Sequence, residues 1–165
     1  MMAAALKPTI EDVWEWLKDV PDPEIPVVSV VDLGIVRDIA WNEDELVVTV
    51  TPTYSGCPAT AVISISIEEE LRKRGVEKVR IETQLAPPWT TAWITEEARR
   101  KLKDYGIAPP LDSASCAGAL TASEIACPRC DSKDVECVSQ FGSTPCKAHY
   151  RCCNCLEPFD YFKCI

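Results

Sequence analysis

The cysteines of this chain give the clearest indication of its chemistry, because their spacing is typical of metal ligands. Cys127-Pro128-Arg129-Cys130 and Cys152-Cys153-Asn154-Cys155 form two Cys-x-x-Cys turns separated by 21 residues. Each turn brings two thiolates close enough to bind one ion, and this spacing is near that of zinc ribbons. Four thiolates suit a tetrahedral, structural zinc ion. We therefore predict metal ligands at Cys127, Cys130, Cys152 and Cys155, brought together by a hairpin between the turns.

Surplus cysteines leave the identity of the metal open. Cys153 lies inside the second turn, and Cys137, Cys146 and Cys164 offer further thiolates. Iron–sulfur clusters also use four cysteines, so spacing alone does not separate zinc from an iron–sulfur cluster. Disulfides are the other alternative, but they belong to oxidising compartments. The first residues lack the basic and apolar regions of a signal peptide, which favours metal ligands over disulfides.

Cys57 stands apart from these turns, before the longest helix that the sequence predicts, Ala59 to Arg74. Pro58 suits the first helical position, which makes Cys57 the N-cap. The helix dipole and the free amides stabilise a thiolate there, so Cys57 is a candidate transient ligand for iron or a cluster. The alternative is a small, buried capping residue. Position alone does not decide between these two roles.

Catalytic constellations are scarce in this sequence. His149 is the only histidine, and we interpret it as a partly exposed residue of the hairpin. Its isolation argues against a histidine-dependent triad or a histidine-based iron site. Asp22, Glu24 and Asp32 are interpreted as solvated or capping groups. We therefore predict no catalytic residues and an accessory protein that is not itself an enzyme.

Hydrophobic patterning predicts an α/β (α+β) fold with a small open sheet. The expected order is α-β-β-α-β-α: an amphipathic helix containing Ile10 to Leu17, a hairpin of 35–41 and 46–51, the helix 59–74, a strand over 76–85, and a helix from Thr95 to Tyr105. Val62, Ile63, Ser66, Ile67 and Leu71 are expected to form the buried stripe of the longest helix. We predict one domain over 1–108, a linker over 109–126 and a zinc-ribbon-like metal-binding domain over 127–165.

The charge distribution limits the partners. The net charge is −9, with 12 basic and 21 acidic side chains before Cys127 and five of each from there onward. Neither part carries the basic footprint that nucleic acids require. No apolar run reaches the length of about 20 residues that crosses a bilayer. We expect a cytoplasmic protein that binds neither nucleic acid nor membranes.

Three motifs in the first part resemble the small proteins of cytosolic iron–sulfur assembly, the MIP18-like family. They are Asp22-Pro23-Glu24-Ile25-Pro26, then Val31-Asp32-Leu33-Gly34-Ile35-Val36, then Ser55-Gly56-Cys57-Pro58. Two tail segments, 141–148 (FGSTPCKA) and 157–164 (EPFDYFKC), narrow the resemblance to the PaaD family, which is encoded with the bacterial phenylacetyl-CoA epoxidase.

This resemblance implies an accessory subunit of a multicomponent di-iron oxygenase in aerobic phenylacetate degradation. It implies a role in maturing an iron–sulfur or di-iron centre, with epoxidase subunits, its reductase or the assembly machinery as partners. It also carries the family's functional thiol to Cys57 and its metal ligands to the two Cys-x-x-Cys turns. Two alternatives remain: an iron–sulfur electron-transfer subunit, indicated by the surplus cysteines, and a structural scaffold of the complex.

Overall fold

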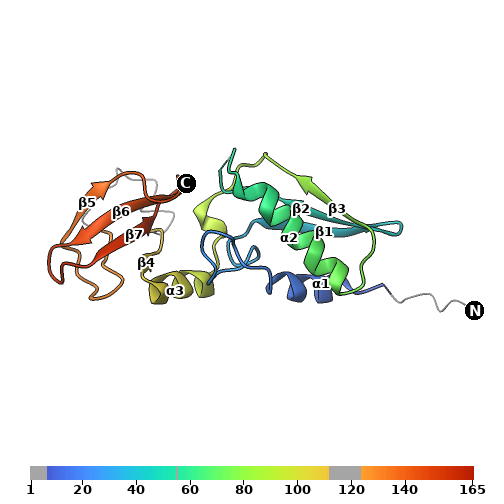
Figure 1. Ribbon diagram of the computed structural model, residues 1–165, viewed down its shortest axis with the longest axis horizontal. Coiled ribbons are helices and arrows are strands. Elements are labelled where there is room, and N and C mark those ends of the chain that lie inside the picture. Colours follow the sequence, from blue (N-terminus) through green and yellow to red (C-terminus); the bar gives the residue numbers. More distant parts are fainter. Residues whose placement is uncertain (1–6, 55, 112–123) are drawn as a thin grey trace, which may run out of the picture. The chain divides into compact units, whose positions relative to one another are not determined.

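The computed structural model describes residues 7–54, 56–111 and 124–165. The chain divides into two compact units, Met1–Pro87 and Pro88–Ile165. Each unit contains its own sheet: three strands in the order β1-β2-β3 in the first, and four strands in the order β4-β7-β6-β5 in the second. The two units are described separately below (Figure 1).

The first unit is a three-stranded sheet with two helices. Its elements are α1 (Ile10–Leu17), β1 (Val36–Asn42), β2 (Glu45–Val50), α2 (Ala59–Lys73) and β3 (Val79–Thr83). β1 and β2 form the predicted antiparallel hairpin, and β3 pairs parallel to β2 after the crossover through α2. Figure 1 shows α2 lying across this sheet. Thr9 caps the start of α1 through a capping box with Asp12, and α1 covers the predicted Ile10 to Leu17.

The buried stripe of α2 differs in part from the prediction. Ala59, Ile63, Ile67 and Leu71 are buried at a spacing of four residues, which places them along one side of the helix. Val62 was expected in this stripe but is 48% exposed, and Ser66 is only half-buried. Successive residues are about 100° apart around a helix, so Val62 turns away from the line through Ile63 and Ile67.

The second unit contains a helix and the four-stranded sheet. Its elements are the short 3₁₀ helix η1 (Thr91–Trp93), α3 (Glu96–Tyr105), β4 (Ile107–Ala108), β5 (Val135–Ser139), β6 (Lys147–Cys152) and β7 (Pro158–Phe162). β5 and β6 form the hairpin expected between the two Cys-x-x-Cys turns, and β7 returns antiparallel to β6. β4 adds parallel to β7. A core of Ala108, Ile125, Cys127, Ala148, Cys152, Phe159 and Tyr161 packs on one face of this sheet.

The predicted order of elements up to residue 108 is confirmed, together with the mixed α and β fold class. The helix α3, which the predicted domain 1–108 groups with the first sheet, belongs to the second compact unit. Residues 112–123 of the expected linker lie outside the described residues. The division into 1–108, 109–126 and 127–165 therefore stays a prediction.

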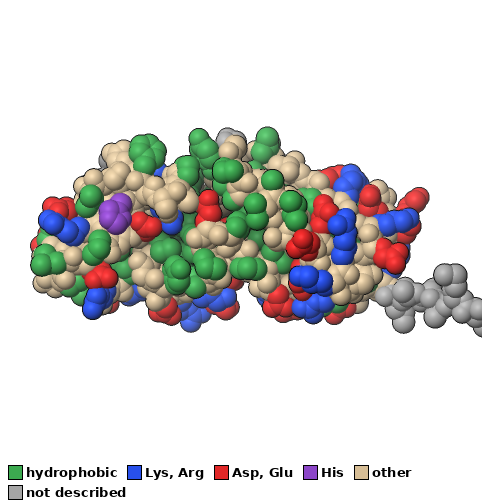
Figure 2. Space-filling view, viewed as in Figure 1, with side chains coloured by type: hydrophobic (Ala, Val, Ile, Leu, Met, Phe, Trp, Pro, Cys, Tyr) green, Lys and Arg blue, Asp and Glu red, His purple; other side chains and the backbone are tan. Residues whose placement is uncertain are grey.

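Surface charge agrees with the sequence composition. On the face in Figure 2, acidic and basic side chains are intermixed and no single basic patch forms. Within the part of the chain that the structure describes, no helix is long and apolar enough to cross a membrane.

Candidate functional site

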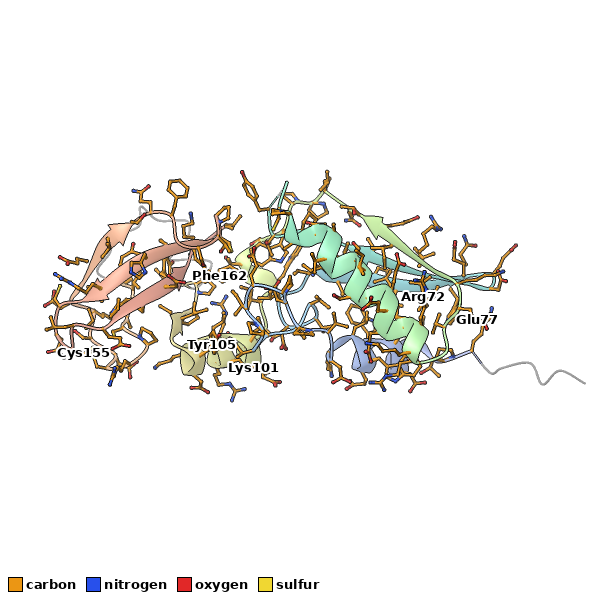
Figure 3. The ribbon with its side chains drawn as sticks, in the orientation of Figure 1. Arg72, Glu77, Lys101, Tyr105, Cys155 and Phe162 are labelled. Atoms are coloured by element: carbon orange, nitrogen blue, oxygen red, sulfur yellow. The ribbon has the colours of Figure 1, made fainter. Side chains whose placement is uncertain are left out.

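The four predicted metal ligands converge at one end of the four-stranded sheet. The Sγ atoms of Cys127, Cys130, Cys152 and Cys155 all lie within 4.8 Å of one another. Cys127 Sγ is 3.7 Å from Cys155 Sγ, and Cys130 Sγ is 3.6 Å from Cys152 Sγ. Figure 3 places Cys155 at the end of the sheet away from Phe162. This four-cysteine cluster can hold a metal ion.

Backbone hydrogen bonds shape both turns of the cluster. In the first turn, the amide of Asp131 donates to the carbonyl of Cys127 at 2.9 Å. In the second, the amide of Cys155 donates to Cys152 Sγ at 3.4 Å, and Asn154 Nδ2 lies 3.8 Å from Cys130 Sγ. Donors to sulfur stabilise thiolates and orient them for a metal. The Cys-x-x-Cys spacing alone did not identify these supporting groups.

The residue after each turn takes a left-handed conformation. Asp131 has φ of 58° and Leu156 has φ of 64°. Glycine favours this region, and a bulky side chain such as leucine is an outlier there. The turns therefore impose the same backbone shape at both positions, whatever residue occupies them.

The local environment shifts the pKa values of two of the cluster thiols in opposite directions. The backbone amide of Cys155 lowers the pKa of Cys152 to about 7, against the opposing effect of burial. For Cys155, the amide of Glu157 lowers the pKa, but desolvation and the neighbouring thiols together raise it to about 12.

The surplus cysteines do not join this cluster. Cys146 is buried, with its Sγ 3.0 Å from Thr144 Oγ1. Cys137 and Cys153 are free and exposed, and Cys164 is disulfide-bonded. The structure therefore brings together only the four ligands of the two turns from this part of the chain, among the residues that it describes.

Cys57 lies in the first unit, on the loop that leads into α2. It is half-buried and free. The helix begins at Ala59, as in the predicted range, but Pro58 and not Cys57 is the N-cap. The carbonyl of Cys57 accepts a hydrogen bond from the amide of Thr60 at 3.1 Å, and no side chain caps the helix. The thiol thus remains close to a helix N-terminus without serving as its cap.

Two aspartates of the first unit act as turn caps. Asp22 Oδ1 accepts from the amides of Glu24 and Ile25 at 2.9 and 2.8 Å. Asp32 Oδ2 accepts from the amide of Ser29, and Ser29 Oγ accepts from the amide of Asp32, both at 3.0 Å. These contacts agree with the interpretation of Asp22 and Asp32 as capping groups. His149, the lone histidine, has its Nδ1 3.2 Å from Asp160 Oδ1 on the neighbouring strand.

Comparisons with known proteins match two different parts of the chain to two family models. Residues 10–83 match the family described as iron–sulfur cluster assembly protein, and residues 112–163 match the PaaD zinc beta ribbon domain. The chain is thus an assembly-type domain followed by a zinc ribbon domain.

Relatives extend this to the whole chain. A protein of Escherichia coli (strain K12), named as a candidate subunit of 1,2-phenylacetyl-CoA epoxidase, is 47% identical over 164 residues, 99% of this chain and 98% of its own length. The chain belongs to the PaaD family. An Fe-S protein maturation auxiliary factor of Porphyromonas gingivalis (strain ATCC BAA-308 / W83) is 36% identical over 57% of this chain and 90% of its own length.

Solved structures resemble the assembly-type part. A domain of unknown function, DUF59, from Bacillus anthracis is 28% identical with a TM-score of 0.52, over 56% of this chain and 89% of that one. A conserved hypothetical protein from Thermotoga maritima is 38% identical with a TM-score of 0.50, over 58% of this chain and 95% of that one. These similarities confirm the predicted fold of the first part and the MIP18-like resemblance.

Proposed function

We propose that this chain is a non-catalytic accessory subunit of a phenylacetyl-CoA epoxidase system that assists maturation of an iron–sulfur or di-iron centre in a partner subunit. Full-length similarity to the E. coli epoxidase subunit supports the pathway. Similarity of the first part to an Fe-S maturation auxiliary factor supports the task. One observation carries the proposal: Cys57 is a half-buried free thiol that is not part of the four-cysteine cluster.

The geometry of the cluster supports zinc as a structural ion. A tetrahedral zinc with Zn–S bonds of about 2.3 Å places its sulfur atoms roughly 3.8 Å apart. The distances of 3.7 and 3.6 Å between cysteine pairs are close to this value. A four-iron cluster binds each thiolate to a separate iron, which requires wider spacing. When bound, zinc would hold the two turns together, with Cys127, Cys130, Cys152 and Cys155 as ligands, and would leave no coordination position open for substrate.

Cys57 is the residue through which the first unit would serve its client. Its thiol lies beside the start of a 15-residue helix whose first amides lack a side-chain cap. Cys57 forms no disulfide and is only half-buried, so its sulfur can be reached by a metal ion. The role proposed for Cys57 is a transient ligand for iron or for a cluster in transfer. In this role the metal is cargo, whereas the zinc of the ribbon stays bound.

The proposal is tested by co-producing the epoxidase with variants of this chain and measuring iron and acid-labile sulfide in the purified epoxidase and its reductase. Cys57→Ser is expected to lower iron or sulfide in the client while the variant itself folds and retains zinc. Cys153→Ser, which removes a different free thiol, is the matched control and is expected to leave client loading unchanged. Full client loading with Cys57→Ser would refute the maturation role.

Two alternatives give different outcomes. An electron-transfer subunit would be purified without oxygen as a coloured iron–sulfur protein and would be reduced by the reductase of the pathway. The separation of Cys137, Cys146 and Cys153 from the four-cysteine cluster argues against it. A scaffold subunit would co-purify with the epoxidase and support full client loading regardless of the Cys57→Ser substitution.

A further inference from the structure

A small pocket lies on the core face of the four-stranded sheet in the second unit, apart from the four-cysteine cluster. Its volume is about 280 Å³. Its walls are mainly apolar and aromatic, and one ammonium group is present: the lining includes Ile125, Phe141, Ala148, Tyr150, Tyr161 and Lys163. Pockets that bind small molecules have this composition, apolar surfaces with a few polar groups that fix orientation.

The pocket is formed by the two tail segments that the sequence singled out. Phe141 and Ala148 are the two ends of the segment 141–148, and Tyr161 and Lys163 come from the segment 157–164. β6 and β7 bring these segments side by side, because Ala148 pairs with Tyr161. The metal cluster and the Cys57 loop do not explain why aromatic residues and a lysine converge here.

Aromatic rings define the shape of the pocket wall. The rings of Tyr150 and Tyr161 meet edge to face, with centroids 5.8 Å apart and an interplanar angle of 82°. Burial is the main cause that raises the pKa of the Tyr150 hydroxyl to about 12, so this group stays neutral. Such walls suit a planar ring, because aromatic contacts add to the gain from area burial. An apolar cavity of about 150 Å³ is already enough for benzene.

Lys163 supplies charge beside these walls. Its Nζ donates to the carbonyl of Gln140 at 3.1 Å and lies 4.8 Å from the centroid of the Phe141 ring. Among the residues that the structure describes, no carboxylate forms an ion pair with this ammonium. In a chain of net charge −9, a lysine without an acidic partner beside an aromatic pocket indicates an anionic ligand.

We propose that this pocket binds a small aromatic carboxylate, with the ring against the aromatic wall and the carboxylate on Lys163. The volume accommodates one ring and a short acid side chain. Lys163 provides an ionic hydrogen bond, and the apolar walls provide most of the buried surface. This binding function goes beyond the proposed role of Cys57 and does not depend on it.

The test is a titration of the full-length, zinc-loaded protein with phenylacetate and with its uncharged counterpart phenylacetamide, followed by NMR. Phenylacetate is expected to shift the ring signals of Tyr150 and Tyr161 and the methyl signal of Ala148. Phenylacetamide is expected to bind roughly five- to tenfold more weakly, because it lacks the charge-assisted contact. Equal affinity for the two compounds, shifts confined to other residues, or no shifts at millimolar ligand would overturn the proposal.

Two variants test the contribution of the Lys163 charge and the contribution of the apolar walls independently. Lys163→Met is expected to remove the preference for phenylacetate, whereas Lys133→Met, at an exposed lysine outside the pocket, is expected to preserve it. Cys137→Leu adds volume at the pocket edge from an exposed strand and is expected to weaken both compounds. Zinc content and thermal unfolding report whether each variant is folded. If Cys137→Leu fails to fold, persistence of the preference in Lys163→Met still refutes the assignment.

Discussion

The two cysteine regions of this protein use the same side chain in opposite ways. In the second unit, four thiols lie within 4.8 Å of one another, and backbone amides and a side-chain amide surround them. In the first unit, Cys57 is a single half-buried thiol beside a helix start. A cluster that satisfies all four positions of a metal ion stabilises a fold, whereas a lone thiol leaves positions for an exchanging partner. The difference predicts permanent binding in one region and transient binding in the other.

Removing one ligand from the cluster should have the largest effect. Cys152→Ser replaces a fully buried thiol of the core and leaves three ligands. Structural zinc supplies an apparent 10–16 kcal/mol in small domains, so we expect loss of zinc and of the folded β5–β7 signals in NMR spectra. The signals of β1–β3 should persist, since the first unit has its own core. Cys153→Ser is the control, and retention of zinc by Cys152→Ser would contradict a structural role.

Substitutions in the buried stripe of α2 should lower the free energy of unfolding strongly, and substitutions on its exposed side should change it little. Ile67 is fully buried, and Ile67→Ala is expected to lower the free energy of unfolding of the first unit by about 2–5 kcal/mol. Val62→Ala, on the exposed side of the same helix, is expected to change it by less than about 0.5 kcal/mol. Urea unfolding measures both. Similar losses for the two variants would show that α2 does not pack as described.

Backbone strain in the metal turn should be relieved by glycine. Leu156 is 67% exposed and has φ of 64°, so its side chain gains little from burial while its backbone is strained. Leu156→Gly is expected to raise the stability of the zinc-loaded second unit by about 1 kcal/mol. Leu156→Ala removes the same exposed side chain but retains a Cβ, and should give no such gain. Thermal unfolding of the two variants separates strain from side-chain loss, and an equal result for both would exclude strain.

The smallest structural effect is expected at Cys57. Cys57→Ser should change the thermal stability of the first unit by less than about 0.5 kcal/mol, because serine is nearly isosteric and the thiol does not cap α2. Alkylation with peptide mapping extends the comparison. In the zinc-loaded chain Cys57 should react, whereas the four cluster cysteines should react only after a chelator is added. If Cys57 is protected and becomes reactive only after the chelator is added, Cys57 also binds the metal, and the two regions do not differ as described.

Local patterns predicted much of this fold and of the metal cluster. The spacing of the Cys-x-x-Cys turns predicted the four ligands and the hairpin between them, because both depend on short-range geometry. The apolar periodicity from Ile10 to Leu17 predicted α1 for the same reason. Position relative to Pro58 placed Cys57 within one residue of its observed place at the start of α2.

Long-range pairing was beyond these patterns. The two-residue strand β4 exists only because Ile107 and Ala108 pair with Asp160 and Tyr161, more than 50 residues away. Val62 is apolar, yet its exposure depends on which side of α2 faces the sheet. The contact of α3 with the second unit likewise rests on tertiary packing that helix periodicity does not encode.

The most direct test of two separate thiol functions is metal and sulfide analysis of the chain purified without oxygen, for the natural sequence and for Cys57→Ser. We predict one zinc per chain, no acid-labile sulfide and a colourless solution for both proteins, because the zinc ligands all lie in the second unit. Stoichiometric iron and sulfide in place of zinc would contradict a structural zinc centre. Loss of zinc in Cys57→Ser would contradict the separation of the transient thiol from the permanent site.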